Sequence, residues 1–315
     1  MRALVADDYG DIARLHVAEL PDPVAGDGDV VVATLACALN PIDLKLLSGE
    51  LRAFMPTAFP YVPGTDLCGI VTSVGANVRG YAPGDRVGGA IRGALAECVR
   101  VDASSPFLAH VPGAVETDVA AAAPLVGCAA LDVMRAAGEV RGASVAVIGA
   151  SGSVGRLVVE RSAALGAHVI ATASPVDDAA VREAGARETI DHTTLPTLAT
   201  IRERVSGGVD VLVDLVNVGD ALAAGAVAVK RGGRLVSTLF GPQATTVGDG
   251  VRLQYVRMGE GPEATGVARV YDLVARGDLH VAIAERHPFD EVRTALQRLR
   301  EGVSGKIVVT MSAPA

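Results

Sequence analysis

The chain has 315 residues, of which 50% are hydrophobic, so it can bury a large core and is long enough for two domains. Its formal net charge is -8 and its basic residues are scattered singly, which argues against a nucleic-acid partner. The longest uncharged apolar run, 119–131, contains Pro124 and Gly127 and is shorter than the roughly 20 residues of a membrane span. We therefore expect a cytoplasmic protein with neither nucleic-acid nor membrane partners.

The first part of the chain has the pattern of a small β-barrel or curled sheet, because short apolar segments alternate with Gly and Pro. A short helix is expected after Asn40 and Pro41. Strands are expected at 12–17, 29–39, 67–74 and 94–101.

From Glu116 onward the pattern changes to helices and strands in alternation. An Ala-rich helix is expected at 116–137, and the tail, with a helix at 289–300 and a strand at 306–310, is expected to return to the first domain. The alternation predicts a parallel sheet covered by helices on both faces, which is a doubly wound domain. Its strands are expected at Ser144, His168, Glu188, 209–215 and 234–238, with helices at Val154, Asp177, Leu198 and 220–229.

A glycine cluster joins the strand beginning at Ser144 to the next helix. This pattern is typical of a nucleotide-phosphate cradle, because glycine lets the backbone approach a pyrophosphate and the first N–H groups of the helix face the charge. Ala150 stands where the G-x-G-x-x-G pattern has its first glycine, and a glycine turn that binds nothing is the alternative. The expected cradle residues are Ala150, Ser151, Gly152, Ser153, Val154 and Gly155.

No metal site is expected from the cysteines and histidines. The cysteines at 37, 68, 98 and 128 form no C-x-x-C pair, and no histidine stands at metal-ligand spacing from another histidine or a cysteine. We expect the cysteines to be small buried hydrophobic residues.

Six motifs in register give the chain a resemblance to a known family. They are NPIDLK at 40–45, PGTDLCG at 63–69, GDRV at 84–87, GALAE at 93–97, the cradle, and GKIVV at 305–309. Together they resemble the zinc-independent quinone oxidoreductase branch of the medium-chain dehydrogenase/reductase superfamily, closest to enone and alkenal reductases. The resemblance implies an α/β fold in which a GroES-like β-barrel domain, 1–120 plus 283–315, surrounds an inserted Rossmann domain, 121–282.

The resemblance also implies an activity: NADPH-dependent reduction of enones, enals or quinones in a cleft between the domains. Zinc-dependent relatives carry a cysteine where Asn40 stands and a histidine near Thr65, so no Lewis acid is expected and the hydride would be delivered to carbon. The resemblance further implies a homodimer formed through an edge strand at 251–258. A redox-silent or cyclase-like member that binds nucleotide only as a scaffold is the alternative.

The end of the second Rossmann strand is expected to choose the coenzyme. Thr172 and Ser174 are the candidate binding residues there, and the absence of Asp and Glu from 169–176 favours NADPH over NADH. Similar reductases have a lysine at position 177, whereas this chain has Asp177, which would repel a 2′-phosphate and leaves NADH open. Ser174 and Asp177 have an alternative role in capping the next helix.

Three further residues are predicted to contact the nucleotide. His192, Asn217 and Phe240 follow successive strands of the Rossmann domain, where ligands of open α/β sheets bind. For His192 the alternative is a solvated loop position, and for Phe240 it is a place in the core.

Lys45 and Asn40 are the predicted catalytic residues. Lysines are rare here, since Lys45, Lys230 and Lys306 are the only ones among 28 basic residues. Lys230 precedes a turn and Lys306 opens the final strand, so both have structural explanations, whereas related enone reductases also carry a lysine at the Lys45 position. Its ammonium could donate to the carbonyl oxygen that gains charge as hydride arrives. Binding of the nicotinamide ribose and a solvated surface position remain alternatives.

Overall fold

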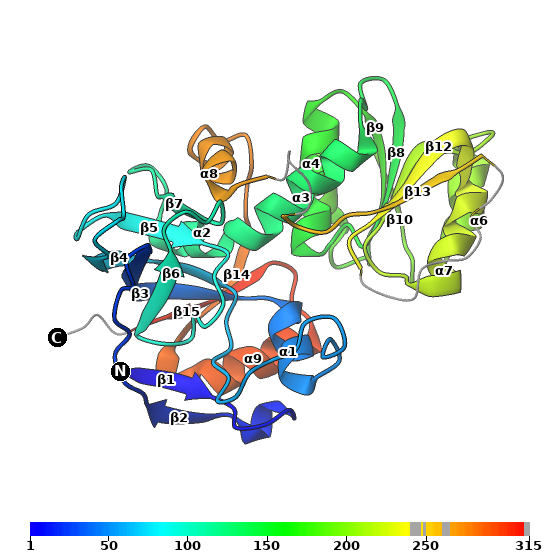
Figure 1. Cartoon of the computed structure of the whole chain (residues 1–315). Coiled ribbons are helices and arrows are strands. Elements are labelled where there is room, and N and C mark those ends of the chain that lie inside the picture. The colour runs from blue at the N-terminus through cyan, green and yellow to red at the C-terminus, as the bar shows by residue number, and fades with distance from the viewer. Residues whose placement is uncertain (240–246, 248–249, 260–264, 312–315) are drawn as a thin grey trace. The chain divides into compact units, whose positions relative to one another are not determined.

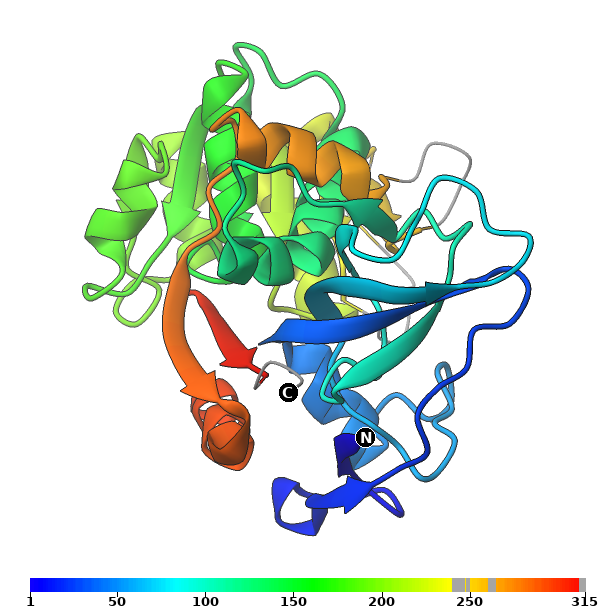
Figure 2. The ribbon, with the colours of Figure 1, turned by 90° about the vertical axis from the view of Figure 1, so that its left-hand side faces the viewer.

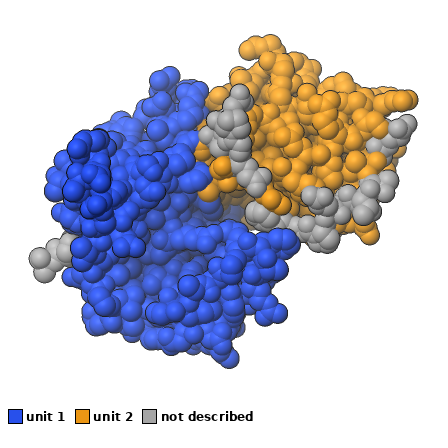
Figure 3. Space-filling model, in the orientation of Figure 1, with its two compact units in different colours: residues 1–125, 266–315 blue, residues 126–265 orange. Residues whose placement is uncertain are grey.

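The computed structural model describes residues 1–239, 247, 250–259 and 265–311. The chain forms two compact units (Figure 3). Unit 1 comprises 1–125 and 266–315, and unit 2 comprises 126–265. No helix in the described ranges is long and apolar enough to cross a membrane.

Unit 2 contains a six-stranded parallel sheet in the order β10-β9-β8-β11-β12-β13. The chain starts at β8 and builds outward in both directions, so the order reverses beside β8, which is the switch point where open α/β sheets bind ligands. The strands are β8 Ser144–Ile148, β9 His168–Thr172, β10 Glu188–Ile190, β11 Val209–Asp214, β12 Val229–Ser237 and β13 Arg252–Tyr255.

Helices cover both faces of this sheet, with α3 and α4 on one face and α6 and α7 on the other (Figure 1). The doubly wound domain predicted from the sequence is therefore confirmed. The helices are α3 Pro124–Ala137, α4 Ser153–Ala164, α5 Asp178–Glu183, α6 Thr197–Arg204 and α7 Gly219–Ala224, with the 3₁₀ turn η2 Gly225–Ala228.

Unit 1 is built around a seven-stranded sheet, of which six strands follow the order β14-β15-β3-β4-β5-β7. The seventh strand, β6, pairs with residues 29–33 at the beginning of β3. Its strands are β3 Asp29–Leu39, β4 Asp66–Val74, β5 Arg86–Gly89, β6 Cys98–Asp102, β7 Leu108–His110, β14 Ile283–Pro288 and β15 Lys306–Thr310. The small sheet of β1 Arg2–Val5 and β2 His16–Glu19 lies in the same unit. Its helices are α1 Pro41–Ser48, α2 Thr117–Ala122, α8 Val267–Ala275 and α9 Val292–Glu301, with 3₁₀ turns η1 Ile12–Arg14 and η3 Phe289–Glu291.

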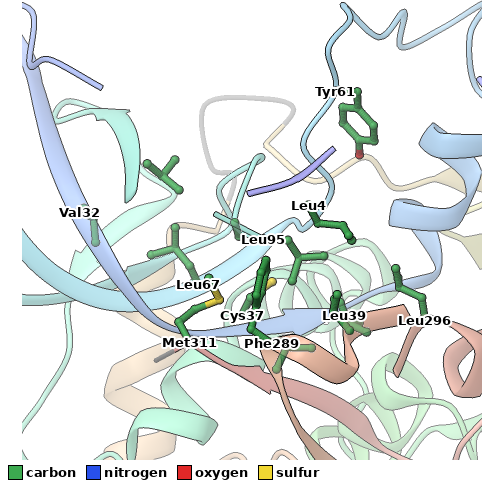
Figure 4. Close-up of a cluster of buried hydrophobic side chains, with 14 of the residues drawn as sticks. Leu4, Val32, Cys37, Leu39, Tyr61, Leu67, Leu95, Phe289, Leu296 and Met311 are labelled. Atoms are coloured by element: carbon green, nitrogen blue, oxygen red, sulfur yellow. The ribbon is translucent and has the colours of Figure 1, made fainter. Parts of the chain in front are cut away.

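The C-terminal strands complete the first sheet, as the sequence predicted. β15 pairs antiparallel with β3 and parallel with β14. Figure 2 shows β14 (orange) and β15 (red) side by side. Inward-facing side chains from these distant segments share one core (Figure 4), including Cys37 and Leu39 of β3, Leu67 of β4 and Phe289 of η3. Asn40 follows directly on β3, so the start of α1 is anchored to this core.

Several sequence predictions need correction. Residues 12–17 form η1 and the start of β2 instead of one strand, and the strand expected at 94–101 is β6, which begins at Cys98. The helix expected at 116–137 is two helices, α2 and α3, divided at Ala123 because Pro124 lacks the N–H that a continuous helix needs there.

Helix α8 lies in unit 1, whereas the sequence analysis placed its residues in the Rossmann domain. Its Tyr271 hydroxyl donates to the Ala120 carbonyl oxygen (2.8 Å), and the Val267 N–H donates to the Pro106 carbonyl oxygen (2.9 Å). These two bonds hold α8 against the first unit, so the second boundary between units falls after Thr265 instead of after residue 282.

Candidate active site

The loop between β8 and α4 forms an open turn at the carboxyl edge of the parallel sheet. Gly149 has a left-handed φ of 84°, and its N–H donates to Thr172 Oγ1 (3.0 Å) at the end of β9. Thr172 is buried, so its observed role is to hold the turn. Gly155 lets α4 approach this turn, because a Cβ there would lie 2.1 Å from the Gly149 carbonyl oxygen.

Gly152 differs from these glycines because the protein itself leaves room for a side chain there. Its φ of -69° suits any residue, and an added Cβ would meet only the Gly149 carbonyl oxygen, at 3.4 Å. Gly152 is the N-cap of α4 and provides no side-chain bond to the first N–H groups of the helix. The open space and the uncapped donors fit an external anion such as a pyrophosphate.

Beyond β9, the Ser174 hydroxyl donates to Asp177 Oδ2 (2.8 Å) across the turn before α5. The capping arrangement considered from the sequence is not formed: α5 begins at Asp178, its N-cap is Asp177 instead of Ser174, and Asp177 makes no side-chain cap hydrogen bond. Asp178 pairs with Arg182 (2.8 Å), so this guanidinium is already engaged.

The remaining predicted nucleotide residues have different settings. His192 is exposed after β10. Asn217 follows β11, and its amide donates to Asp214 Oδ2 (2.8 Å). Phe240 lies outside the described residues.

Exposed apolar side chains gather at the same edge of the sheet. They follow the carboxyl ends of three strands, and Val176 is 88% exposed. They make up half of the exposed large apolar residues in the described ranges, so this edge is better suited than the rest of the unit to the flat apolar face of a ligand. The residues are Val176 after β9, Leu195 after β10, and Val216 and Val218 after β11.

Unit 1 contains a buried polar cluster at the start of α1. The Lys306 ammonium donates to Asn40 Oδ1 and to Asp66 Oδ2 (3.2 Å). The Asn40 amide nitrogen donates to Asp66 Oδ2 (2.8 Å) and to Thr65 Oγ1 (3.1 Å). Each of these four side chains is buried, and Lys306 and Asn40 are each 2% exposed.

Asp43 extends this cluster into the first turn of α1. Its Oδ2 accepts from the Asn40 N–H (2.8 Å), which is half of a capping box, whereas its Oδ1 has no hydrogen-bond partner. Burial raises the pKa of the Asp43 carboxyl to about 7, and the Asn40 N–H and the Lys306 charge oppose that shift. Burial also raises the pKa of Asp66, against the influence of Lys306.

The two predicted catalytic residues differ in accessibility. The Lys45 side chain is 40% exposed on α1, and its Nζ pairs with Glu50 Oε1 (3.0 Å). Asn40 is buried, and both ends of its amide are bonded inside the protein. A ligand can therefore reach the Lys45 ammonium, whereas the Asn40 amide is buried and bonded to Lys306 and Asp66.

Sequence reasoning missed Lys306, Asp66 and Asp43 as members of a site. Two signals could have found them: both Lys306 and Asp66 lie inside motifs that carried the resemblance, and Lys306 is one of three lysines. The partner residues are too far apart in the chain for spacing to reveal the contact.

Two family models match the chain. The alcohol dehydrogenase GroES-like domain matches residues 26–136, and the zinc-binding dehydrogenase model matches residues 184–309. Among curated relatives, the chloroplast envelope quinone oxidoreductase homolog of Arabidopsis thaliana is 28% identical over 98% of both chains. The 2-methylene-furan-3-one reductase of Solanum lycopersicum is 29% identical over 98% of this chain and 79% of its own length.

A solved structure supports the same relationship. The quinone oxidoreductase of Pseudomonas syringae pv. Tomato DC3000 has a TM-score of 0.88 and 25% identity, covering 98% of this chain and 99% of that one.

One of the two matching families is that of zinc-binding dehydrogenases, but the buried cluster does not fit a zinc ion. Zinc in proteins is bound by Cys, His and carboxylate groups, whereas Asn40 and Thr65 are neutral and the Lys306 ammonium would repel a second cation. Across the described ranges, no group of three or more His, Cys, Asp or Glu side chains could hold a metal ion.

We predict that Asp43 makes the fold less stable as pH rises. Its pKa is higher in the folded state than the ordinary 3.8, so the folded chain binds more protons between about pH 4 and pH 7 and loses stability across that window. The loss is at most ~4 kcal/mol, since one pKa unit corresponds to about 1.4 kcal/mol. Denaturant unfolding of wild type and Asp43→Asn across this range measures it.

In Asp43→Asn the amide oxygen can still accept from the Asn40 N–H, so the variant should show a flatter profile than wild type. Asp220→Asn, at an exposed aspartate of α7, controls for the substitution itself. Parallel pH profiles for wild type and Asp43→Asn would show that Asp43 ionises in the fold as easily as in the unfolded chain.

Proposed function

Because the chain belongs to the medium-chain dehydrogenase/reductase superfamily and resembles its quinone oxidoreductases, we propose that it is an NAD(P)H-dependent reductase of enones, enals or quinones that works without zinc. The observation that supports this proposal most is the buried Lys306 ammonium, which donates to Asp66 and to Asn40, the residue at which the resemblance implies a cysteine ligand in zinc-dependent relatives. Without a Lewis acid to polarise a carbonyl or alcohol oxygen, the proposal favours addition of hydride to the β-carbon of a conjugated acceptor.

The nucleotide would be held at the carboxyl edge of the unit 2 sheet. The pyrophosphate would lie over the open side of Gly152 and accept from the first N–H groups of α4, with 150–155 as the cradle. Thr172 supports the turn, and the exposed apolar residues after β9, β10 and β11 would contact the bases. His192 and Asn217 would lie at the rim of that surface.

NADPH remains the proposed coenzyme, because no acidic residue lies at 169–176 to favour a free ribose hydroxyl. Asp177 disfavours NADPH, because its carboxylate would repel a 2′-phosphate. It also accepts a hydrogen bond from Ser174, the candidate phosphate-binding residue. Initial rates with each nucleotide decide the question, and a higher kcat/KM with NADH would reverse this assignment.

When bound, the coenzyme supplies a hydride. In the proposed reaction this adds to the β-carbon of the conjugated substrate, the double-bond electrons move to the carbonyl oxygen, and a proton then reaches the α-carbon. Lys45 would donate a hydrogen bond to that oxygen as its negative charge grows. The substrate oxygen would take the place of Glu50, the present partner of the ammonium.

We also propose a homodimer formed through β13. This strand is at one end of the six-stranded order and pairs with β12 on its inner side. An outer strand can pair with the same strand of a second copy. A cytoplasmic location remains a prediction, and one relative is a chloroplast envelope protein.

An absorbance assay at the nicotinamide band against a panel of enones, enals and quinones tests the proposed activity. Oxidation of the coenzyme with saturation of the acceptor's carbon-carbon double bond, or with quinol formation, is expected. Tight nucleotide binding without turnover on any acceptor would favour the redox-silent alternative.

Gly152→Asp should abolish nucleotide binding while the fold persists. The protein leaves room for the new side chain, but its carboxylate would occupy the pyrophosphate position and add a like charge. A fluorescence titration with NADPH measures affinity, and thermal unfolding measures stability.

Gly113→Asp is the matched control, since Gly113 also has an ordinary φ and open space around it. Unchanged affinity in a folded Gly152→Asp protein would place the pyrophosphate elsewhere.

Lys45→Met should lower kcat about ten- to a thousandfold, the range for loss of one oxyanion donor, and change nucleotide affinity far less. Steady-state kinetics on the best acceptor, with Lys230→Met as a control at the other partly exposed lysine, measures this effect. Wild-type turnover in Lys45→Met would leave the backbone N–H groups as the stabilisers of the oxyanion.

A further inference from the structure

Lys306 is a buried cation at the first residue of β15, and its setting differs from that of the other two lysines. Lys45 and Lys230 have side chains that are 40% and 51% exposed, whereas Lys306 is 2% exposed. A buried ammonium is costly unless it is paired and hydrogen-bonded, and this one meets Asn40 and Asp66.

The charges around Asn40 determine which way its amide points. An ammonium can only donate, so it must face the amide oxygen, and an ionised carboxylate can only accept, so it must face the amide nitrogen. Lys306 lies on the oxygen side, whereas Asp66 Oδ2, 2.8 Å away, lies on the nitrogen side. Asn40 is therefore held in one orientation by opposite charges on its two ends.

Asn40 in turn fixes the beginning of α1. It is the N-cap of this helix, in extended conformation (φ -135°, ψ 151°), and its N–H donates to Asp43 Oδ2 (2.8 Å). α1 has eight residues, fewer than a helix needs to be stable by itself, so its position depends on its cap and on buried Leu46 and Leu47. Lys45 lies on the same helix.

We infer that Lys306 is a positioning residue for the reaction: its ammonium orients Asn40, and through this cap it sets the position of α1 and of Lys45. The inference rests on the proposed function. Lys306 itself touches no substrate, and its effect on turnover would pass through Asn40.

A purely structural role predicts a different outcome, and a double variant separates the two. Lys306→Met leaves the Asp66 carboxylate buried without its cation, so it should be less stable than wild type. Adding Asp66→Asn removes that unpaired charge and should restore most of the melting temperature. The double variant still lacks the ammonium on Asn40 Oδ1.

We expect kcat to fall at least about tenfold in both Lys306→Met and the double variant, with the dissociation constant for NADPH within about twofold of wild type. The effect on kcat should therefore persist when stability has been restored. Wild-type kcat in the stable double variant would overturn the inference and leave Lys306 with a role in folding only.

Amide hydrogen exchange gives a second readout that needs no turnover. In the double variant the amides of α1 should exchange at least about tenfold faster than in wild type, while those of α4 in unit 2 should not change. Unchanged exchange across α1 would overturn the inference. If wild type reduced no acceptor, the proposed function would fail, and the exchange experiment would still decide whether Lys306 positions α1.

Discussion

The contact between the Lys306 ammonium and its two partners joins the parts of unit 1 that carry its chemistry. Lys306 opens β15, Asp66 opens β4, and Asn40 follows β3 and caps α1. Asp66 Oδ1 also accepts from the N–H of Leu125 in the first turn of α3 (2.9 Å). Because replacing a buried ion pair by apolar residues is often neutral or stabilising, we propose that this contact serves to orient Asn40.

The two units offer different kinds of polar groups to a ligand. In unit 2 the donors are backbone N–H groups, and they are available because Gly152 has no side chain and its surroundings leave that space open. Gly149 and Gly155 serve the protein's own packing, since a Cβ at either would lie under 3.0 Å from neighbouring atoms. In unit 1 the polar groups are side chains. Lys306, Asn40 and Asp66 are buried and bonded to one another, whereas Lys45 is partly exposed on α1.

The sequence predicted the fold well where pattern is local. The limits of β3 and β15 match the expected 29–39 and 306–310, and β8 to β12 of the parallel sheet were found because strands and helices alternate there, whereas β13 was expected only from the family resemblance. The cluster could not be found this way, because Lys306 and Asn40 are 266 residues apart and meet only after β15 pairs with β3. The unit of α8 was predicted wrongly for a similar reason, since the bond from Tyr271 to Ala120 that holds α8 in unit 1 joins residues 151 apart in the chain.

We propose that the buried Lys306 ammonium takes the place that a metal cation has in zinc-dependent relatives. The most direct measurement is the zinc content of the purified protein together with its turnover before and after exhaustive dialysis against a strong chelator. We expect far less than one zinc ion per chain and the same kcat in both samples. Stoichiometric zinc whose removal abolishes turnover, and whose return restores it, would contradict a zinc-independent reaction.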